Sequence, residues 1–225
     1  MSYVPFLEGE TVDLCVPTKE AIRDGWADWF NDARTTTYLC QGVFPNTVEA
    51  QERFYEGLQN GSRLALLVCG KGGEDLWGTI SLSTIDWVAR SAQIALVLST
   101  AKRPQLAALE AMALMTRHGF ETLGLERIWA GQAYPNLAKW GRRLEVLGYR
   151  AEGFIRRGFA KGRRVHDTVM ISVLYEDYAQ ICGKRDYWPG AEEIRKLLSL
   201  WPSGLSERIA EAVKREQAAY EREIP

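Results

Sequence analysis

The sequence predicts a mixed α/β domain whose central sheet is largely antiparallel and flanked by helices. Three strand-like runs, 63–69, 76–85 and 91–99, follow one another with turn residues between them, as in an antiparallel meander. The alanine-rich run 107–120 comes next and has the composition of a helix. A strand, a helix and a two-stranded hairpin are then expected at 127–131, 138–147, 149–159 and 165–174. This order contains no repeating βαβ unit, so a doubly wound parallel sheet is not expected.

Two helices are expected before the meander. The first follows Thr18, a residue type that caps helix N-termini. Its apolar residues recur at helical spacing and are expected to face the core: Ile22, Trp26, Trp29 and Phe30. The second helix follows Asn46 or Thr47 and ends at Asn60-Gly61.

The character of the chain changes near residue 179. A helix is expected at 191–200 and a charged helix at 205–222. We therefore expect one domain over 1–178 and a helical extension over 179–225. The narrow apolar stripe of the last helix packs either on its own domain or on a second copy of the chain, as a homodimer contact.

Composition and charge exclude several classes of protein. The 225 residues include 28 Lys and Arg against 29 Asp and Glu, a net charge of −1 that argues against a nucleic-acid or anionic-membrane binder. The longest apolar runs fall far short of the roughly 20 residues that span a bilayer, and the start of the chain lacks a secretory pattern. The four cysteines are widely spaced and only His118 and His166 are present, so we expect a cytoplasmic protein without a metal site.

Basic residues concentrate between Lys139 and Arg164. This stretch carries nine Lys and Arg but only Glu145 and Glu152 as acids. Two interpretations stay open: a solvated basic face, or a site for a phosphorylated small molecule contacted by Arg156 and Arg157, because guanidinium groups pair with phosphate oxygens.

The start of the long helix has the features of an anion site. Ser99 through Ala108 lead directly from a strand into the helix, whose first backbone N–H groups lack helical partners. Lys102 and Arg103 add positive charge there, and Pro104 suits a first helical turn.

Several stretches occur in the order and spacing of a known family. They are Leu7-Glu8-Gly9-Glu10, Trp29-Phe30-Asn31-Asp32, Trp77-Gly78-Thr79-Ile80, Ile85 through Ile94, Gly119-Phe120, Leu123 through Ile128, Asn136, Leu144 through Gly153, and Asp167. Over about residues 7–178 the chain resembles the GNAT superfamily of acyl-CoA-dependent N-acyltransferases. Its likeness is greatest to the branch with ribosomal-protein alanine acetyltransferases and amino-sugar N-acetyltransferases.

The resemblance implies a sheet with a splayed pair of strands that admits acetyl-CoA. Residues 94–98 would offer their backbone to the pantetheine arm, and the next helix N-terminus would hold the pyrophosphate. The implied cofactor-binding residues are Val97, Leu98, Ser99, Arg103, Pro104, Gln105, Leu106, Ala107, Ala108 and Asn136. Leu106 stands where the family has a glycine that lets the backbone approach the pyrophosphate. Asn136 is equally well placed to cap a helix.

The resemblance also implies catalytic residues. The tyrosine that commonly protonates the departing thiolate falls on Leu144, so Tyr134 is the nearest replacement. Gln93 stands where a glutamate often acts as base, and glutamine does not take up a proton at neutral pH. Deprotonation then falls to water, backbone carbonyls or a carboxylate, either Asp86 or Asp32, although both also suit turns. Asp32 is further expected to contact the substrate.

The implied activity is direct transfer of an acetyl group from acetyl-CoA to a primary amine. The acceptor is a nucleotide-linked amino sugar or a protein N-terminal amine, and the basic surplus argues against a polycationic aminoglycoside. The alternative is a catalytically degenerate GNAT-like binding or assembly module, which Leu106, Gln93 and Leu144 favour.

Overall fold

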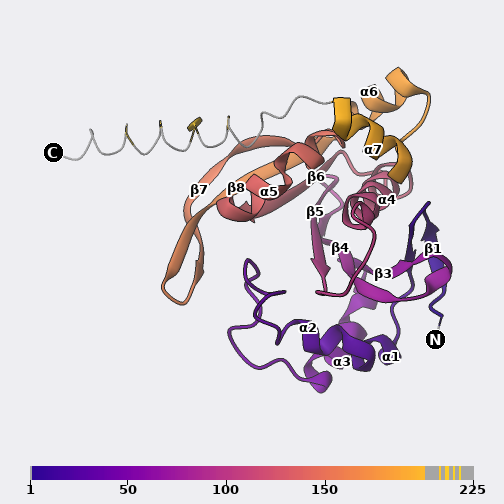
Figure 1. The fold of residues 1–225 in the computed structure, drawn as a ribbon, viewed down its shortest axis with the longest axis vertical. Coiled ribbons are helices and arrows are strands. Elements are labelled where there is room, and N and C mark those ends of the chain that lie inside the picture. Colours follow the sequence, from indigo (N-terminus) through magenta and orange to yellow (C-terminus); the bar gives the residue numbers. More distant parts are fainter. Residues whose placement is uncertain (1, 201–207, 209–210, 213–214, 216–217, 219–225) are drawn as a thin grey trace.

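The computed structural model describes residues 2–200 together with residues 208, 211, 212, 215 and 218. One sheet of eight strands has the order β1-β2-β3-β4-β5-β6-β8-β7, and all neighbours are antiparallel except β5 and β6 (Figure 1). The strands are β1 (Pro5–Glu8), β2 (Val12–Cys15), β3 (Leu64–Gly70), β4 (Leu76–Asp86), β5 (Ser91–Leu98), β6 (Arg127–Ala133), β7 (Arg150–Lys161) and β8 (Arg164–Leu174). The predicted mixed α/β class with a largely antiparallel sheet is confirmed.

Helices cover both faces of this sheet (Figure 1). The helical elements are α1 (Lys19–Ala21), the π-helical turn η1 (Ile22–Trp26), α2 (Ala27–Trp29), α3 (Val48–Glu56), α4 (Ala107–Glu121), α5 (Tyr134–Glu145), α6 (Tyr175–Arg185) and α7 (Ala191–Leu200). The short elements η2 (Gly57–Asn60) and η3 (Lys71–Gly73) lie beside β3 in the chain. In the part of the chain that the structure describes, no helix combines the length and apolarity needed to cross a membrane.

Two clusters of buried side chains define the layers. The larger cluster joins the sheet to α4, α5 and α7, and almost every residue of α4 is buried because its alanines let it approach the strands closely. The smaller cluster joins the opposite face of β2 and β3 to α1, η1 and α2 through Ile22, Trp26 and Phe30. The sheet therefore separates two apolar layers, and β5 has one face toward each.

The N-terminal helices differ from the prediction in one respect. Thr18 and Thr47 cap helices as expected, each accepting a hydrogen bond from the backbone N–H three residues later. The run after Thr18 is not one continuous helix, however, because Gly25 has φ +137° and interrupts it with η1. Only glycine adopts this conformation readily.

The helix α5 begins four residues before its predicted start. Pro135 lies in its first turn, where a proline costs no hydrogen bond. Ala133 is the N-cap residue, so the prediction that Asn136 caps this helix is wrong, and Asn136 lies inside the first turn.

Three elements were not predicted: β1, β2 and α6. The strands have four residues each, too few to show a clear alternation. The boundary expected between residues 178 and 179 falls within α6, and Tyr178 and Ile194 both belong to the larger cluster. Residues 191–200 form the helix expected there. The helix expected at 205–222 lies largely outside the described residues.

Candidate active site

The parallel strands β5 and β6 separate part-way along their length. They pair only over Ser91–Gln93 and Arg127–Trp129. Beyond Gln93, β5 keeps β4 as its partner, so its other edge has no strand beside it. The splayed pair expected from the resemblance is therefore present.

A cavity of about 240 Å³ opens at this separation, and we call it the splay cavity. Its apolar wall comes from β5, α4, β6, α5 and β8: Ile94, Leu96, Leu98, Met112, Ala130, Leu144 and Ile171. Its polar groups are Arg34, Thr35, Thr37, Tyr38, Arg103, Gln132 and Asn136. A narrow apolar slot with polar groups at its rim is the ordinary form of a small-molecule site.

The segment between β5 and α4 forms a compact turn at the end of the splay cavity. The Arg103 guanidinium donates to the backbone carbonyls of Ser99 and Ala101, at 2.7 and 3.0 Å. The Ser99 hydroxyl accepts from the Ala101 N–H at 3.3 Å. Burial lowers the pKa of Arg103 below its ordinary value, although a guanidinium stays charged at neutral pH. The turn thus places a cation beside the N-terminus of α4.

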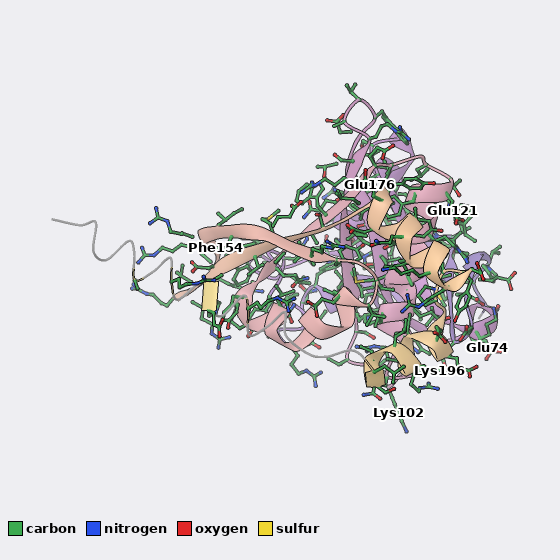
Figure 2. All side chains as sticks on the ribbon, turned by 90° about the horizontal axis from the view of Figure 1, so that it is seen from above. Glu74, Lys102, Glu121, Phe154, Glu176 and Lys196 are labelled. Atoms are coloured by element: carbon green, nitrogen blue, oxygen red, sulfur yellow. The ribbon has the colours of Figure 1, made fainter. Side chains whose placement is uncertain are left out.

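Leu106 does not enter the splay cavity. It is the N-cap residue of α4, its side chain is buried in the larger cluster, and its carbonyl accepts from the N–H groups of Leu109 and Glu110 at 2.9 Å. Pro104 and Gln105 are exposed, whereas Ala107 and Ala108 are buried in α4. Lys102 is exposed at the edge of the molecule (Figure 2). The leucine at the family's glycine position therefore faces the core.

Asn136 and Gln132 lie together on the wall formed by β6 and α5. The Asn136 side-chain amide donates to the Gln132 side-chain carbonyl at 2.7 Å, and both residues line the splay cavity. Leu144 lines the same cavity but has no ionisable group. Val97 and Leu98 are lining residues as expected.

A second cavity, of about 340 Å³, lies on the opposite face of the sheet, and we call it the strand-face cavity. Its floor consists of cross-strand pairs between β4 and β5: Thr79 with Val97, Ser81 with Ala95, and Ser83 with Gln93. Trp26, Phe30 and Phe54 form aromatic walls. Ala95 and Val97 line both cavities, so the two cavities meet at the splayed part of β5.

Residues 30–47, the covering loop, contribute to both cavities. Arg34, Tyr38 and Leu39 line the splay cavity, and Phe30 and Gln41 line the strand-face cavity. Tyr38 is the one phenol among the described residues that line either cavity.

The hairpin β7–β8 holds this loop from a distance of more than 100 residues in the chain. The hairpin projects from the body of the molecule as an arm that carries Phe154 (Figures 1 and 2). Near its tip, the Lys161 ammonium donates to the carbonyls of Thr36 and Gln41, at 2.6 and 2.8 Å. The centre of the Tyr38 ring lies 6.3 Å from the centres of the Phe159 and His166 rings.

Asp32 acts inside the covering loop. Its carboxylate accepts from the backbone N–H and the guanidinium of Arg34 and from the Thr35 hydroxyl. The hydrogen bonds from the Arg34 backbone and side chain lower the pKa of Asp32, so this carboxylate stays ionised at neutral pH. Arg34 in turn reaches the Thr100 hydroxyl at 3.5 Å, across the mouth of the splay cavity. Asp32 thereby orients a second guanidinium near the Arg103 turn.

The remaining predicted site residues lie elsewhere. Asp86 ends β4, and its carboxylate accepts from the N–H groups of Val88 and Ala89 in the hairpin turn. Arg156 and Arg157 occupy a bulge of β7, where Asp167 accepts from the Arg157 N–H at 2.8 Å. Tyr134 is the first residue of α5 and packs against the larger cluster. None of these four predicted site residues is among those lining the two cavities, so the structure does not bring them to the site.

Arg63 also lines the strand-face cavity. This residue was missed from the sequence, together with Arg34, Tyr38 and the hydroxyls of β4. The alternation of Thr79, Ser81 and Ser83 with Ile80 and Leu82 was a usable signal, because every second residue of a strand faces the same side. The two arginines and Tyr38 carry no such pattern.

Comparisons with solved structures agree with this architecture. The spermidine N-acetyltransferase from Vibrio cholerae in complex with CoA and spermine has a TM-score of 0.68 and 18% identity, over 75% of this chain and 98% of that one. A GCN5-related N-acetyltransferase from Brucella melitensis has a TM-score of 0.65 and 21% identity, over 85% and 94%. At these identities the likeness establishes the fold. No curated protein is significantly similar in sequence.

Residues 16–148, more than half of the chain, match the model of the acetyltransferase (GNAT) domain. This match includes β5, the Arg103 turn, Asn136 and the covering loop. The chain therefore belongs to the GNAT acetyltransferase family.

Proposed function

We propose that this protein transfers an acetyl group from acetyl-CoA to the primary amine of a small molecule or peptide. The observation that carries the proposal is the meeting of the two cavities at Ala95 and Val97. One cavity is suited to a thioester and the other to an amine. Their shared boundary is where the two reacting groups would come together, and such positioning supplies a large part of the rate of a two-substrate reaction.

The residues of the splay cavity fit acetyl-CoA, which when bound there supplies an activated acetyl group as a thioester. The open edge of β5 from Ile94 to Leu98 offers unpaired backbone groups to the amides of the pantetheine arm. Asn136 adds a side-chain amide on the facing wall. Arg103 and the N-terminus of α4 offer positive charge to the pyrophosphate.

The transfer forms one C–N bond and breaks one C–S bond. The amine nitrogen loses a proton and the departing sulfur gains one, so the products are an N-acetyl amide and the free thiol. Tyr38 is the cavity-lining residue that can give the sulfur its proton, and the covering loop positions it. Gln93 in the floor of the strand-face cavity accepts hydrogen bonds but no proton, so the amine enters neutral or loses its proton to water.

A nucleotide-linked amino sugar and a protein N-terminal amine are the acceptors that the sequence resemblance favours. The Vibrio cholerae spermidine N-acetyltransferase, solved in complex with spermine, has the same fold and binds a small amine. The acceptor is therefore the property that experiment must assign.

The test combines binding and turnover. Calorimetry with acetyl-CoA measures occupation of the splay cavity, and release of free thiol in the presence of an amine panel, with mass spectrometry of the product, measures transfer. Tyr38→Phe is expected to lower kcat by about 100-fold or more, the range of general-acid catalysis, while Tyr134→Phe changes it little. No acetyl-CoA binding at millimolar concentration would refute the proposal. Binding without transfer to any amine would identify a non-catalytic module.

A further inference from the structure

We infer that the acceptor is a hydroxylated amine that carries an anionic group, and that it is not a polyamine. This inference rests on the proposed function and concerns the strand-face cavity. It follows from the chemistry of the cavity lining, from the charge of Arg63, and from the distance between Arg63 and the point where the two cavities meet.

Apart from Arg63, the lining of the strand-face cavity is uncharged and rich in hydrogen-bonding groups. Among the described residues no Asp or Glu lines it. Its uncharged hydroxyl and amide side chains are those of Ser81, Ser83, Thr79, Gln41, Gln51 and Gln93. A polyamine carries several positive charges and needs carboxylates to replace its water. Hydroxyl and amide side chains instead match the hydroxyl groups of a neutral or anionic substrate.

Two carboxylates of α3 near this cavity form ion pairs with basic side chains of the first helical segment. Glu52 and Glu56 are two acids of α3 that lie one or two residues after the lining residues Gln51 and Phe54. Glu52 pairs with Arg23 at 2.9 Å, and Glu56 pairs with Lys19 at 3.0 Å. Both pairs join α3 to the first helical segment, and neither acid contributes to the cavity.

Arg63 gives the strand-face cavity its positive charge. Its guanidinium lies over the Phe54 ring at 5.0 Å from the ring centre, and both residues line the cavity. Within the described ranges no carboxylate pairs with Arg63, unlike Arg23. A partly buried guanidinium that lies over an aromatic ring and has no carboxylate partner in the described part of the chain is suited to a carboxylate or phosphate of the ligand.

The strand register fixes the distance between this charge and the reaction point. Leu64 pairs with Leu82, so Arg63 lies beside Ser83, and Ser83 pairs with Gln93. The cavities meet at Ala95 and Val97, which lie two and four residues after Gln93 along β5. A strand rises about 3.4 Å per residue and neighbouring strands lie about 4.8 Å apart, so the backbone of Arg63, two strands away from β5, lies about 12 to 17 Å from Ala95 and Val97. Arg63 lines the same cavity, so its long side chain covers part of this span, and the acceptor covers the rest between its amine and its anionic group. The α-amine and carboxylate of a single amino acid are too close together to meet this requirement.

Aromatic walls complete the site. Trp26, Phe30 and Phe54 face the hydroxyl-bearing floor, and the central row of the floor is made of small residues, Ala65 and Ala95 on either side of Ser81. Aromatic faces contact the C–H surface of a ring, and the floor presents hydroxyls. The site therefore fits a substrate about one saturated ring in size between its amine and its anion.

The experiment compares four acceptors with the full-length protein and acetyl-CoA: glucosamine 6-phosphate, glucosamine, 6-aminohexanoate and spermidine. We expect glucosamine 6-phosphate to have the highest kcat/KM, about tenfold or more above glucosamine, because a charge-assisted hydrogen bond is lost without the phosphate. 6-Aminohexanoate, which carries a carboxylate without hydroxyls, is expected to fall between glucosamine 6-phosphate and spermidine. Calorimetry of glucosamine 6-phosphate binding gives a second readout that is independent of turnover.

Arg63→Gln is the diagnostic variant, and Arg53→Gln is its matched control, since Arg53 is an exposed arginine of α3 outside the cavity. Arg63→Gln should bring glucosamine 6-phosphate down to the level of glucosamine and weaken its binding about tenfold, while Arg53→Gln changes neither. Preference for spermidine, equal use of glucosamine and its phosphate, or 6-aminohexanoate equal to or better than glucosamine 6-phosphate would overturn the inference. Absence of acetyl-CoA binding would instead refute the proposed function, and the two failures are thus distinguishable.

Discussion

The two cavities that share β5 are built in different ways. The wall of the splay cavity formed by β5, α4 and α5 consists of regular elements within one stretch of the chain, residues 91–145. The strand-face cavity takes its lining from η1, the covering loop, α3 and three strands, and the loop depends on Lys161 from the opposite end of the domain. That wall of the splay cavity belongs to the hydrophobic core, whereas the covering loop, which lines both cavities, receives hydrogen bonds from Lys161 of the arm.

This difference determines which lining side chains can be substituted without repacking the core. Substitutions in the wall that β5, α4 and α5 give to the splay cavity must also repack the core, at a cost that core substitutions commonly carry. The exposed side chains of the covering loop, such as Arg34 and Gln41, lie outside both apolar clusters and can change without repacking them. We therefore expect acceptor preference to be the more adaptable property.

The largest expected effect comes from closing the boundary between the cavities. Ala95→Phe places a ring at the shared wall and should lower kcat/KM by about 100-fold or more, because displacement of reacting groups by about 1 Å already costs that much. Acetyl-CoA affinity and product identity are measured alongside. Ala89→Phe, at an exposed residue of the β4–β5 turn, is the control. Unimpaired transfer by Ala95→Phe would show that the reaction does not take place at this boundary.

The next effect tests whether the arm supports the covering loop. Lys161→Met removes the ammonium that donates to the carbonyls of Thr36 and Gln41, and hydrogen bonds from a charged group contribute about 1.5–3 kcal/mol each when well formed. We expect kcat to fall about tenfold through loss of Tyr38 positioning, with the Kd of acetyl-CoA within about threefold of the original. Steady-state kinetics and calorimetry measure the two quantities. Lys184→Met, at an exposed residue of α6, should leave both quantities unchanged. An equal fall in kcat in this control would contradict the role of the arm in supporting the covering loop.

A smaller effect is expected on the affinity of the splay cavity for acetyl-CoA. Asn136→Ala removes one side-chain amide and leaves Gln132 without its partner, so the Kd of acetyl-CoA should rise about five- to tenfold. The kcat at saturating acetyl-CoA should change less than in Lys161→Met. Unchanged affinity would remove Asn136 from the cofactor site.

The smallest expected effect is on the pH dependence of thermal stability, to which His118 of α4 contributes and Asp32 of the covering loop does not. Burial, with a lesser effect from Arg117, lowers the pKa of His118 in α4 below 6.5, so the unfolded chain takes up this proton first as the pH falls. The stability contributed by neutral His118 is present above pH 6.5 and is lost as the pH falls through the lowered pKa. Asp32 in the covering loop has a lowered pKa and keeps its charge throughout this range. The Tm of the native protein should fall between pH 7.5 and 5.5 by about 1–2 °C more than that of His118→Gln. Equal slopes would show that His118 does not titrate in this range.

The regular elements could be predicted because their signals are local. The meander, α4 and α7 follow from alternation, alanine content and turn residues. The family resemblance placed Val97 and Leu98 at the predicted cofactor site, and the position of Arg103 just before a helix N-terminus placed it there too. The direction in which a single side chain points could not be predicted in the same way. Leu106 was expected at the phosphate turn and faces the core, because the first turn of α4 rotates it toward the strands.

Residues that meet only through tertiary contacts could not be predicted. Tyr38 reaches the splay cavity because the covering loop folds back under the arm, and no spacing in the sequence encodes that contact. Asp86 shows the converse case. Asp86 was a candidate base because Gln93 stands where the family often has a glutamate, but the N–H groups of Val88 and Ala89 satisfy its carboxylate within the turn.

The bulge in β7 has a consequence for how this enzyme family can diversify. Three residues, Arg156 to Gly158, stand opposite Asp167 alone, and beyond them the register resumes with Phe159 opposite His166. The number of residues past the bulge sets where the tip of the hairpin ends, at about 3.4 Å for each added residue. Lengthening both strands by two residues would carry the ammonium of Lys161 about 7 Å beyond the carbonyls it now binds. The tip of the hairpin lines neither cavity, and its length is thus a means of retuning which amines the molecule admits.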